Sequence, residues 1–303
     1  LYSFDAYING ARVYDYTFEL TESSYFTAGV LCHEFFHVLG APDLYHYNNN
    51  GAPDAVGGWD LMESTSNPPQ YMGAFLKWKY GDWIPEIPEI TSTGSYTLNP
   101  LQEPENSSYK IASPNSDTEY YVLEYRVKEG DYDSNTPGSR DGLLVYRINT
   151  EAGNGNAQGP PDEVYLYRPG GSLTSQGSFV SAPYNSVWSH TELNDFTNPE
   201  PFLYNDGNGG PGGLNLLNVG AGGETITFTI SMGVPTIELD QSSILFEMAP
   251  NEFQSKNIVL SKSDYMQINI FDSKGKLVKK LFNGELSIGQ YSFRWNGLNE
   301  QNI

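Results

Sequence analysis

The chain has 303 residues, and its 37 acidic residues outnumber its 16 basic ones, which gives a formal net charge of −21. A surface this acidic is repelled by nucleic-acid phosphates and by anionic lipids, so we expect no binding to nucleic acid. No apolar run approaches the roughly 20 residues that cross a bilayer, so no membrane span is predicted. Aromatic residues make up 14% of the chain and charged residues 17%, a composition that excludes a disordered protein.

Cysteine and turn-forming residues indicate the general type of fold. The one cysteine, Cys32, excludes an intrachain disulfide framework and a zinc cage of several thiolates, and we expect it to be a small buried residue on a helix. The 31 glycines, 19 prolines and 22 tyrosines are typical of a β-rich protein with many turns.

The N-terminal third contains the segments with helical periodicity. One helix is predicted over residues 25–39, with Ser23 or Ser24 as its N-cap and Gly40 as its stop. A second helix is predicted over residues 70–79, just after two prolines. The apolar residues that share a face of the first helix are Ala28, Leu31, Cys32, Phe35, Phe36 and Leu39.

Beyond the predicted helices, short β-type runs alternate with turns, and the whole chain is predicted to be an α+β protein. We expect a mixed domain over residues 1–90, a β-rich, sandwich-like domain over residues 91–233 and a small immunoglobulin-like β module over residues 234–303. The strands predicted in the last two parts are 94–98, 120–127, 143–148, 163–167, 225–231, 244–248, 256–260, 266–271 and 291–295.

The segment HEFFHVLGAPD, which begins at His33, carries the strongest chemical signal. His33 and His37 lie four residues apart, so on a helix both rings point from one face and can bind the same metal ion. Glu34 lies about a quarter turn away, where it can contact a metal-bound water without binding the metal. Gly40 ends the helix and lets the chain turn back, so Asp43 can supply a third ligand. Two His, one Asp and an open position predict a catalytic zinc site.

An amphipathic core helix whose histidines only form hydrogen bonds is the structural alternative for this segment. His46 and His190 each stand alone in the sequence and are expected to be surface or hydrogen-bonded residues. Met62 lies nineteen positions after Asp43, and we interpret it as part of an apolar floor beneath the metal rather than as an ordinary core methionine.

The segment HEFFHVLGAPDLY, followed by GGWDLM and PPQYMGAFLKWKYGDW, resembles the immune inhibitor A family of secreted bacterial metallopeptidases, a branch of the metzincins. The likeness continues through EYYVLEYRVKEGDYD and PGSRDGLLVYRIN and covers about residues 25–230. The final segments INIFDSKGKLVKKLF and GQYSFRWNG resemble immunoglobulin-like modules of flagellar hook-capping type. This resemblance implies that the zinc ligands are His33, His37 and Asp43. It also implies that Glu34 is the general base and that Met62 lies in the Met-turn.

The resemblance also implies parts that this chain lacks. Metzincin catalytic domains place a twisted sheet and a long helix ahead of the zinc helix, whereas only 32 residues precede His33. We therefore expect the N-terminal part of the catalytic domain to be missing from this chain. The C-terminal module ends soon after Trp295, where its relatives continue for another strand, so we expect that module to be truncated as well.

The predicted reaction is hydrolysis of a peptide bond by a metal-activated water, with Glu34 taking the proton of the water and passing it to the leaving amine. Tyr45 and Tyr71 are the candidates for stabilising the oxyanion. A structural calcium ion is a further expectation. The run Asp131 to Asn135 alternates oxygen ligands but lacks the Gly and Glu of an EF-hand, and a solvated turn fits it equally well, so no calcium ligands are assigned.

Together these features predict a secreted or cell-surface bacterial zinc endopeptidase that acts on extracellular proteins or peptides. The alternative from another class is a non-catalytic adhesin or binding scaffold that retains a peptidase fold. The three ligands together with Glu34 favour the enzyme, because a scaffold has no chemical need for them. A serine hydrolase is set aside because the chain contains no Gly-x-Ser-x-Gly segment.

Overall fold

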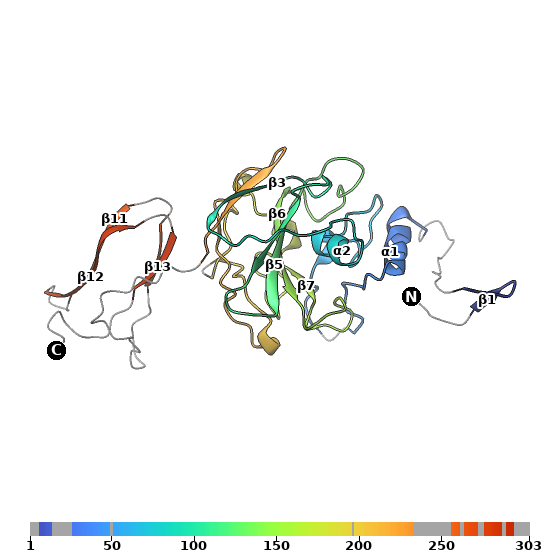
Figure 1. The fold of residues 1–303 in the computed structure, drawn as a ribbon, viewed down its shortest axis with the longest axis horizontal. Coiled ribbons are helices and arrows are strands. Elements are labelled where there is room, and N and C mark those ends of the chain that lie inside the picture. The colour runs from blue at the N-terminus through green and yellow to red at the C-terminus, as the bar shows by residue number, and fades with distance from the viewer. Residues whose placement is uncertain are drawn as a thin grey trace. The chain divides into compact units, whose positions relative to one another are not determined.

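The computed structural model describes residues 6–13, 26–48, 51–195, 197–232, 256–260, 264–271, 276–286 and 289–293. The chain divides into two compact units, Leu1–Ile230 and Ser231–Ile303, and Figure 1 labels some of their elements. The three domains expected from the sequence stay a prediction. Among the described residues, no helix has both the length and the apolar character needed to cross a bilayer.

The first unit combines helices and strands. Its helices are α1 (Ala28–Val38) and α2 (Ala74–Lys79), with short 3-10 helices η1 (Gly57–Trp59), η2 (Phe179–Ser181), η3 (Ser186–Trp188) and η4 (Asn205–Gly207). Its strands are β1 (Ala6–Ile8), β2 (Ala11–Val13), β3 (Gly94–Leu98), β4 (Ser108–Ala112), β5 (Glu119–Arg126), β6 (Gly142–Asn149), β7 (Val164–Leu166), β8 (Leu216–Leu217) and β9 (Ile226–Ile230).

Two antiparallel sheets follow α2 along the chain. One has the strand order β4-β5-β6-β7 and the other the order β3-β9-β8. Every residue of β6 is buried, which agrees with its almost continuous apolar sequence GLLVYRIN. Helices and two antiparallel sheets in one unit are compatible with the predicted α+β class.

The buried side of helix α1 differs from the side that its apolar pattern predicts to be buried. Its buried residues are Gly29, His33 and Phe36, whereas Cys32 and Phe35 are exposed. The prediction that Cys32 is buried is therefore wrong. On the buried side, His33 is hydrogen-bonded to the carbonyl of Leu61 and Gly29 lies against the backbone of Ser66.

Both predicted helices begin later than expected. The N-cap of α1 is Thr27 rather than Ser23 or Ser24, and its side chain accepts a hydrogen bond from the backbone of the third helical residue. Helix α2 begins at Ala74 because the backbone N–H of Ala74 donates to Glu124 on β5, at 2.6 Å. This bond places the start of α2 beside β5, as Figure 1 shows.

The second unit consists of β-strands in its described part. They are β10 (Lys256–Leu260), β11 (Asp264–Phe271), β12 (Leu277–Leu286) and β13 (Gly289–Phe293). Strand β10 pairs antiparallel with β13, and β11 pairs antiparallel with β12. The predicted strand 256–260 is confirmed, and the predicted strands 266–271 and 291–295 overlap β11 and β13. The predicted strand 244–248 lies outside the described residues.

Candidate metal centre

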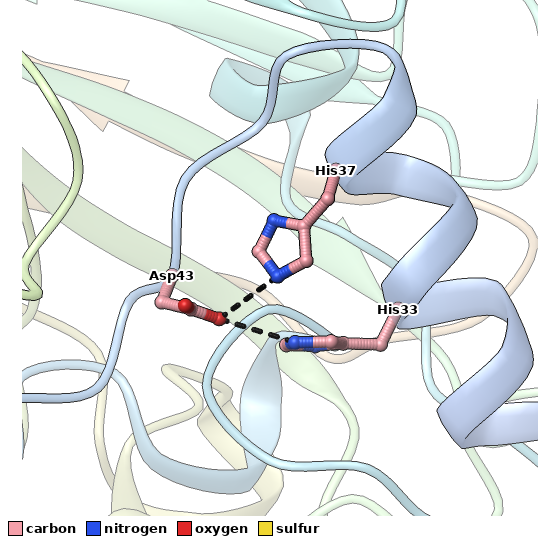
Figure 2. A group of neighbouring side chains, drawn as sticks. All are labelled: His33, His37 and Asp43. Carbon is pink, nitrogen blue, oxygen red and sulfur yellow. Dashed lines mark ion pairs between the residues drawn. The ribbon is translucent and has the colours of Figure 1, made fainter. Parts of the chain in front are cut away.

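The two histidines of the motif lie on α1, separated by about one turn. The helix ends at Val38, and Gly40 follows with φ of +96°, a backbone conformation that favours glycine. The predicted stop at Gly40 is therefore confirmed. After it, the chain turns back so that residues 41–43 approach the face that carries His33 and His37, as Figure 2 shows.

A backbone carbonyl orients each imidazole ring. The Nδ1 of His33 lies 2.9 Å from the carbonyl oxygen of Leu61, and the Nδ1 of His37 lies 2.7 Å from that of Ala41. A carbonyl oxygen can only accept, so Nδ1 carries the proton in both rings. In the neutral form, each Nε2 is then left with a lone pair that can bind a metal.

The carboxylate of Asp43 meets both Nε2 atoms. Its Oδ1 lies 3.1 Å from Nε2 of His33 and 3.3 Å from Nε2 of His37, and the three side chains converge in Figure 2. Oδ1 is buried and has no hydrogen-bond partner. The lone pairs of the two Nε2 atoms and of Oδ1 repel each other when no proton lies between them. A cation bound between the three atoms would remove this repulsion.

This group also meets the size requirement of a metal site. In the part of the chain that the structure describes, the three ligand atoms all lie within 4.8 Å of one another. His33 and Asp43 are buried, and His37 is half-buried, which leaves an approach from solvent. Two imidazole nitrogens and one carboxylate oxygen fit zinc with a further position open for water or substrate.

The electrostatics of the site keep a carboxylate available. Burial acts to raise the pKa of Asp43, but the adjacent His33 and His37 and the hydroxyl of Tyr47 hold that pKa well below its usual range. Burial acts to lower the pKa of His33, but Asp43 and the Leu61 carbonyl outweigh it and raise that pKa. Both directions reflect a site whose acceptors attract a cation.

Tyr47 is a site residue that the sequence analysis did not single out. Its hydroxyl donates to Oδ2 of Asp43 and leaves Oδ1 to face the histidines. Such an outer hydrogen bond fixes the orientation of a ligating carboxylate. No periodic signal identifies Tyr47, because it lies in the irregular segment after the helix among several other tyrosines.

The segment around Met62 is hydrogen-bonded to the elements that carry the three converging side chains. The Met62 carbonyl accepts from the backbone of Leu44, and the preceding carbonyl of Leu61 accepts from His33. The Met62 side chain is completely buried, and its backbone N–H donates to the buried carboxylate of Asp60 at 2.8 Å. This tight turn therefore contacts both the helix that carries His33 and the loop that carries Asp43.

The other predicted residues differ in their distance from the ligands. Glu34 is half-buried, and its charge acts on both His33 and Tyr45. The ring of Tyr45 stacks beside His33, with centroids 6.5 Å apart. The ring of Tyr71 instead lies under the ammonium of Lys77, at 4.5 Å. The structure thus places Tyr45 beside His33 and Glu34 next to His33 on α1, and no described contact joins Tyr71 to the site.

The two isolated histidines are hydrogen-bonded, as expected. His46 contacts Asp162, with 2.6 Å between Nε2 and Oδ1. The Nδ1 of His190 lies 3.1 Å from the carbonyl oxygen of Pro183. Neither belongs to the group of metal-binding side chains described above.

Asp133, the central residue of the run considered for calcium, is bound to Arg126. Both carboxylate oxygens of Asp133 accept from the guanidinium of Arg126, at 2.6 and 2.7 Å. A carboxylate held in this way is occupied by a buried ion pair.

Comparison with known families adds an independent observation. Residues 4–76 match the family model of the immune inhibitor A peptidase M6 catalytic domain. The matched M6 segment contains α1, the three converging side chains and the Met62 turn, and it supports a metallopeptidase. Residues 251–303 match the FlgD Ig-like domain, so the resemblances to both families are confirmed, while the likeness expected from residue 77 to residue 230 stays a prediction. Searches of curated proteins and of solved structures gave no match.

Proposed function

We propose that this protein is a zinc-dependent endopeptidase of the metzincin type. The observation that carries the proposal is the convergence of Nε2 of His33, Nε2 of His37 and Oδ1 of Asp43 within a segment that matches a peptidase catalytic domain. A core helix with satisfied histidines does not need three acceptors that face one another. The same argument favours an enzyme over an adhesin that merely retains the fold.

His33, His37 and Asp43 would hold the zinc ion. When bound in an open site, zinc acts as a Lewis acid that lowers the pKa of water from about 16 towards 7 and polarises the scissile carbonyl. The carbonyls of Leu61 and Ala41 keep both imidazoles in the tautomer that presents Nε2. The protein therefore orients the lone pairs of both Nε2 atoms for metal binding through its own backbone hydrogen bonds.

Glu34 takes the proton of the attacking water and passes it to the leaving amine. Its position next to His33 on α1, where its carboxylate helps to raise the pKa of His33 and of Tyr45, supports this role. Tyr45 is the better candidate for stabilising the developing oxyanion, because its ring lies beside His33. Burial raises the pKa of Tyr45, and Asp43 and Glu34 add to this, so the phenol remains a hydrogen-bond donor.

The finer architecture belongs to the same proposal. Residues 1–90 form the metzincin-like domain with Met62 in its Met-turn, residues 91–233 form a β-sandwich, and residues 234–303 form the immunoglobulin-like module. A secreted or cell-surface bacterial protein that cleaves extracellular proteins fits the M6 match and the strongly acidic composition. A structural calcium ion stays a prediction without assigned ligands.

The role of Glu34 is tested with the Glu34→Gln variant. Zinc binding should be unchanged, because Glu34 is not a ligand, while hydrolysis of casein should fall by about 10² to 10⁴-fold. Glu86→Gln is the control, since Glu86 is an exposed residue outside the site. Zinc-loaded Glu34→Gln that cleaves casein as fast as the control would refute the proposed role.

A further inference from the structure

The third ligand lies on a loop that a distant part of the chain contacts. We call residues 41–47 the ligand loop and residues 153–163, between β6 and β7, the bracing loop. The backbone N–H of Asn156 donates to the backbone carbonyl of Asp43, at 2.9 Å. The bracing loop thus holds the backbone of the very residue whose side chain faces the two histidines.

Two further contacts join the same loops. The backbone N–H of Tyr47 donates to the carbonyl of Ala157, at 2.9 Å. The imidazole of His46 contacts the carboxylate of Asp162, at 2.6 Å, and both of these side chains are largely buried. The bracing loop therefore holds the ligand loop at Asp43 and again at the following turn.

The bracing loop is itself held rigidly. The side chain of Asn156 is fully buried, donates to the carbonyl of Val164 and accepts from the backbone N–H of the same residue. The backbone N–H of Gly155 donates to the buried carboxylate of Glu163, at 2.6 Å. These bonds anchor the bracing loop to the start of β7, so it can act as a fixed support.

The fit between the loops leaves no space for a side chain at Gly155. A Cβ at this position would overlap the backbone carbonyl oxygen of Asp43 and lie 2.7 Å from Cβ and Cγ of Pro42. Gly153, two residues earlier, has nearly the same left-handed φ, +60° against +69°, but a Cβ there would lie 3.6 Å or more from its neighbours. The close approach at Gly155 is therefore specific to the ligand loop.

We propose that the bracing loop positions Asp43 for metal binding, with Gly155, Asn156 and the His46–Asp162 pair as positioning residues. This inference rests on the proposed metal site. The two histidines are placed by one helix, whereas Asp43 lies on irregular backbone whose contacts include residues more than a hundred positions downstream. Outer contacts of this kind typically change metal affinity about 10 to 100-fold when they are removed.

The test measures the zinc dissociation constant of the full chain by competition with a chromophoric chelator, and separately the urea stability of the metal-free protein. Gly155→Ala should weaken zinc binding by about 10 to 100-fold, whereas Gly153→Ala, which introduces the same backbone strain, should leave it within about threefold. Asp162→Ala should weaken binding about tenfold, and Asp162→Asn, which can still accept from His46, should restore most of it.

The outcomes separate the two claims. If the wild-type chain binds zinc and Gly155→Ala binds it as tightly as Gly153→Ala, the bracing loop does not position the ligand and this inference is wrong. The same holds if Gly155→Ala and Asp162→Ala lose urea stability but keep the wild-type zinc constant, since that pattern indicates a purely structural loop. A folded wild-type chain that binds no zinc would instead overturn the proposed function on which the inference depends.

Discussion

At the scale of single residues, backbone carbonyls determine the chemistry of the candidate site. The carbonyl oxygens of Leu61 and Ala41 accept hydrogen bonds from Nδ1–H of His33 and His37, and this arrangement leaves a lone pair on both Nε2 atoms in the neutral rings. The sequence could predict that two histidines four residues apart face the same way. It could not predict these carbonyls, because a carbonyl is present at every position and only the fold selects one.

Glu63, next to the Met62 turn, predicts a pH dependence of stability. Burial raises its pKa from an ordinary 4.5 to about 8, although its carboxylate accepts from the backbone N–H of Val56. Between pH 4.5 and 8 the unfolded chain releases this proton and the folded chain keeps it, so the contribution to stability is full below pH 4.5 and is lost as the pH rises through 8.

Glu63→Gln should therefore flatten the decline in the free energy of unfolding between pH 5 and 8, by about 3–4 kcal/mol. Urea unfolding of the variant and the wild type at several pH values measures the difference, and the exposed Glu86→Gln provides the control. Parallel curves for Glu63→Gln and the wild type would show that Glu63 is already ionised in the folded protein.

At the scale of elements, the packing of α1 depends on a small residue. A Cβ on Gly29 would overlap the backbone carbonyl oxygen of Ser66, so the helix lies directly against this backbone segment. The helical pattern correctly predicted that a helix exists. It failed to predict which side is buried, because a glycine that permits close approach has no hydrophobic signature of its own.

Gly29→Ala should therefore destabilise the protein by about 1–3 kcal/mol, even though alanine favours a helix by about 1 kcal/mol over glycine. Ala28→Gly, at the neighbouring exposed position, should cost no more than about 1 kcal/mol. Urea unfolding of both variants measures this. A Gly29→Ala protein more stable than the wild type would mean that α1 does not pack closely on Ser66.

The positions of strands along the chain were easier to predict than the pairing of those strands in the sheets. The predicted strand 94–98 coincides with β3, and 120–127 and 143–148 agree with β5 and β6 within about two residues. Strands β4 and β8 were missed, since SYKIA has two polar residues among its five and LL is too short to show alternation. Sheet order depends on contacts between distant segments, which a single sequence does not display.

At the scale of the whole first unit, a buried ionic network joins the peptidase-like segment to the sheets. The guanidinium of Arg126 on β5 binds Glu124 and Asp133, and it also donates to the carbonyl of Trp59 at 3.1 Å. Glu124 in turn accepts from the backbone of Ala74 at the start of α2. The segment before residue 90 is thus held by polar contacts from the segment after it.

Arg126→Met should destabilise the protein by about 3–5 kcal/mol, because two buried carboxylates lose their cation. Arg140→Met, which removes a half-buried cation lying over Trp188, should cost about 1 kcal/mol or less. Urea unfolding of the two variants measures the contrast. Equal losses would show that the network contributes no more than an ordinary surface interaction.

The candidate site as a whole was predictable to the extent that it is local. His33, His37 and Asp43 all lie within residues 33–43, so helix geometry and one glycine turn predict that the three side chains can converge. Tyr47 and the bracing loop were not predicted, because their parts in the site depend on irregular backbone and, for the bracing loop, on contacts across more than a hundred residues.

The metal content of the purified full chain after dialysis tests the central claim most directly. Plasma mass spectrometry should find about one zinc per wild-type chain and a strong loss in His37→Ala, which removes one of the three ligands. Far-UV circular dichroism should show that both proteins are folded. A folded wild-type chain without zinc, or a His37→Ala chain that keeps it, would contradict the assignment of His33, His37 and Asp43 as the metal site.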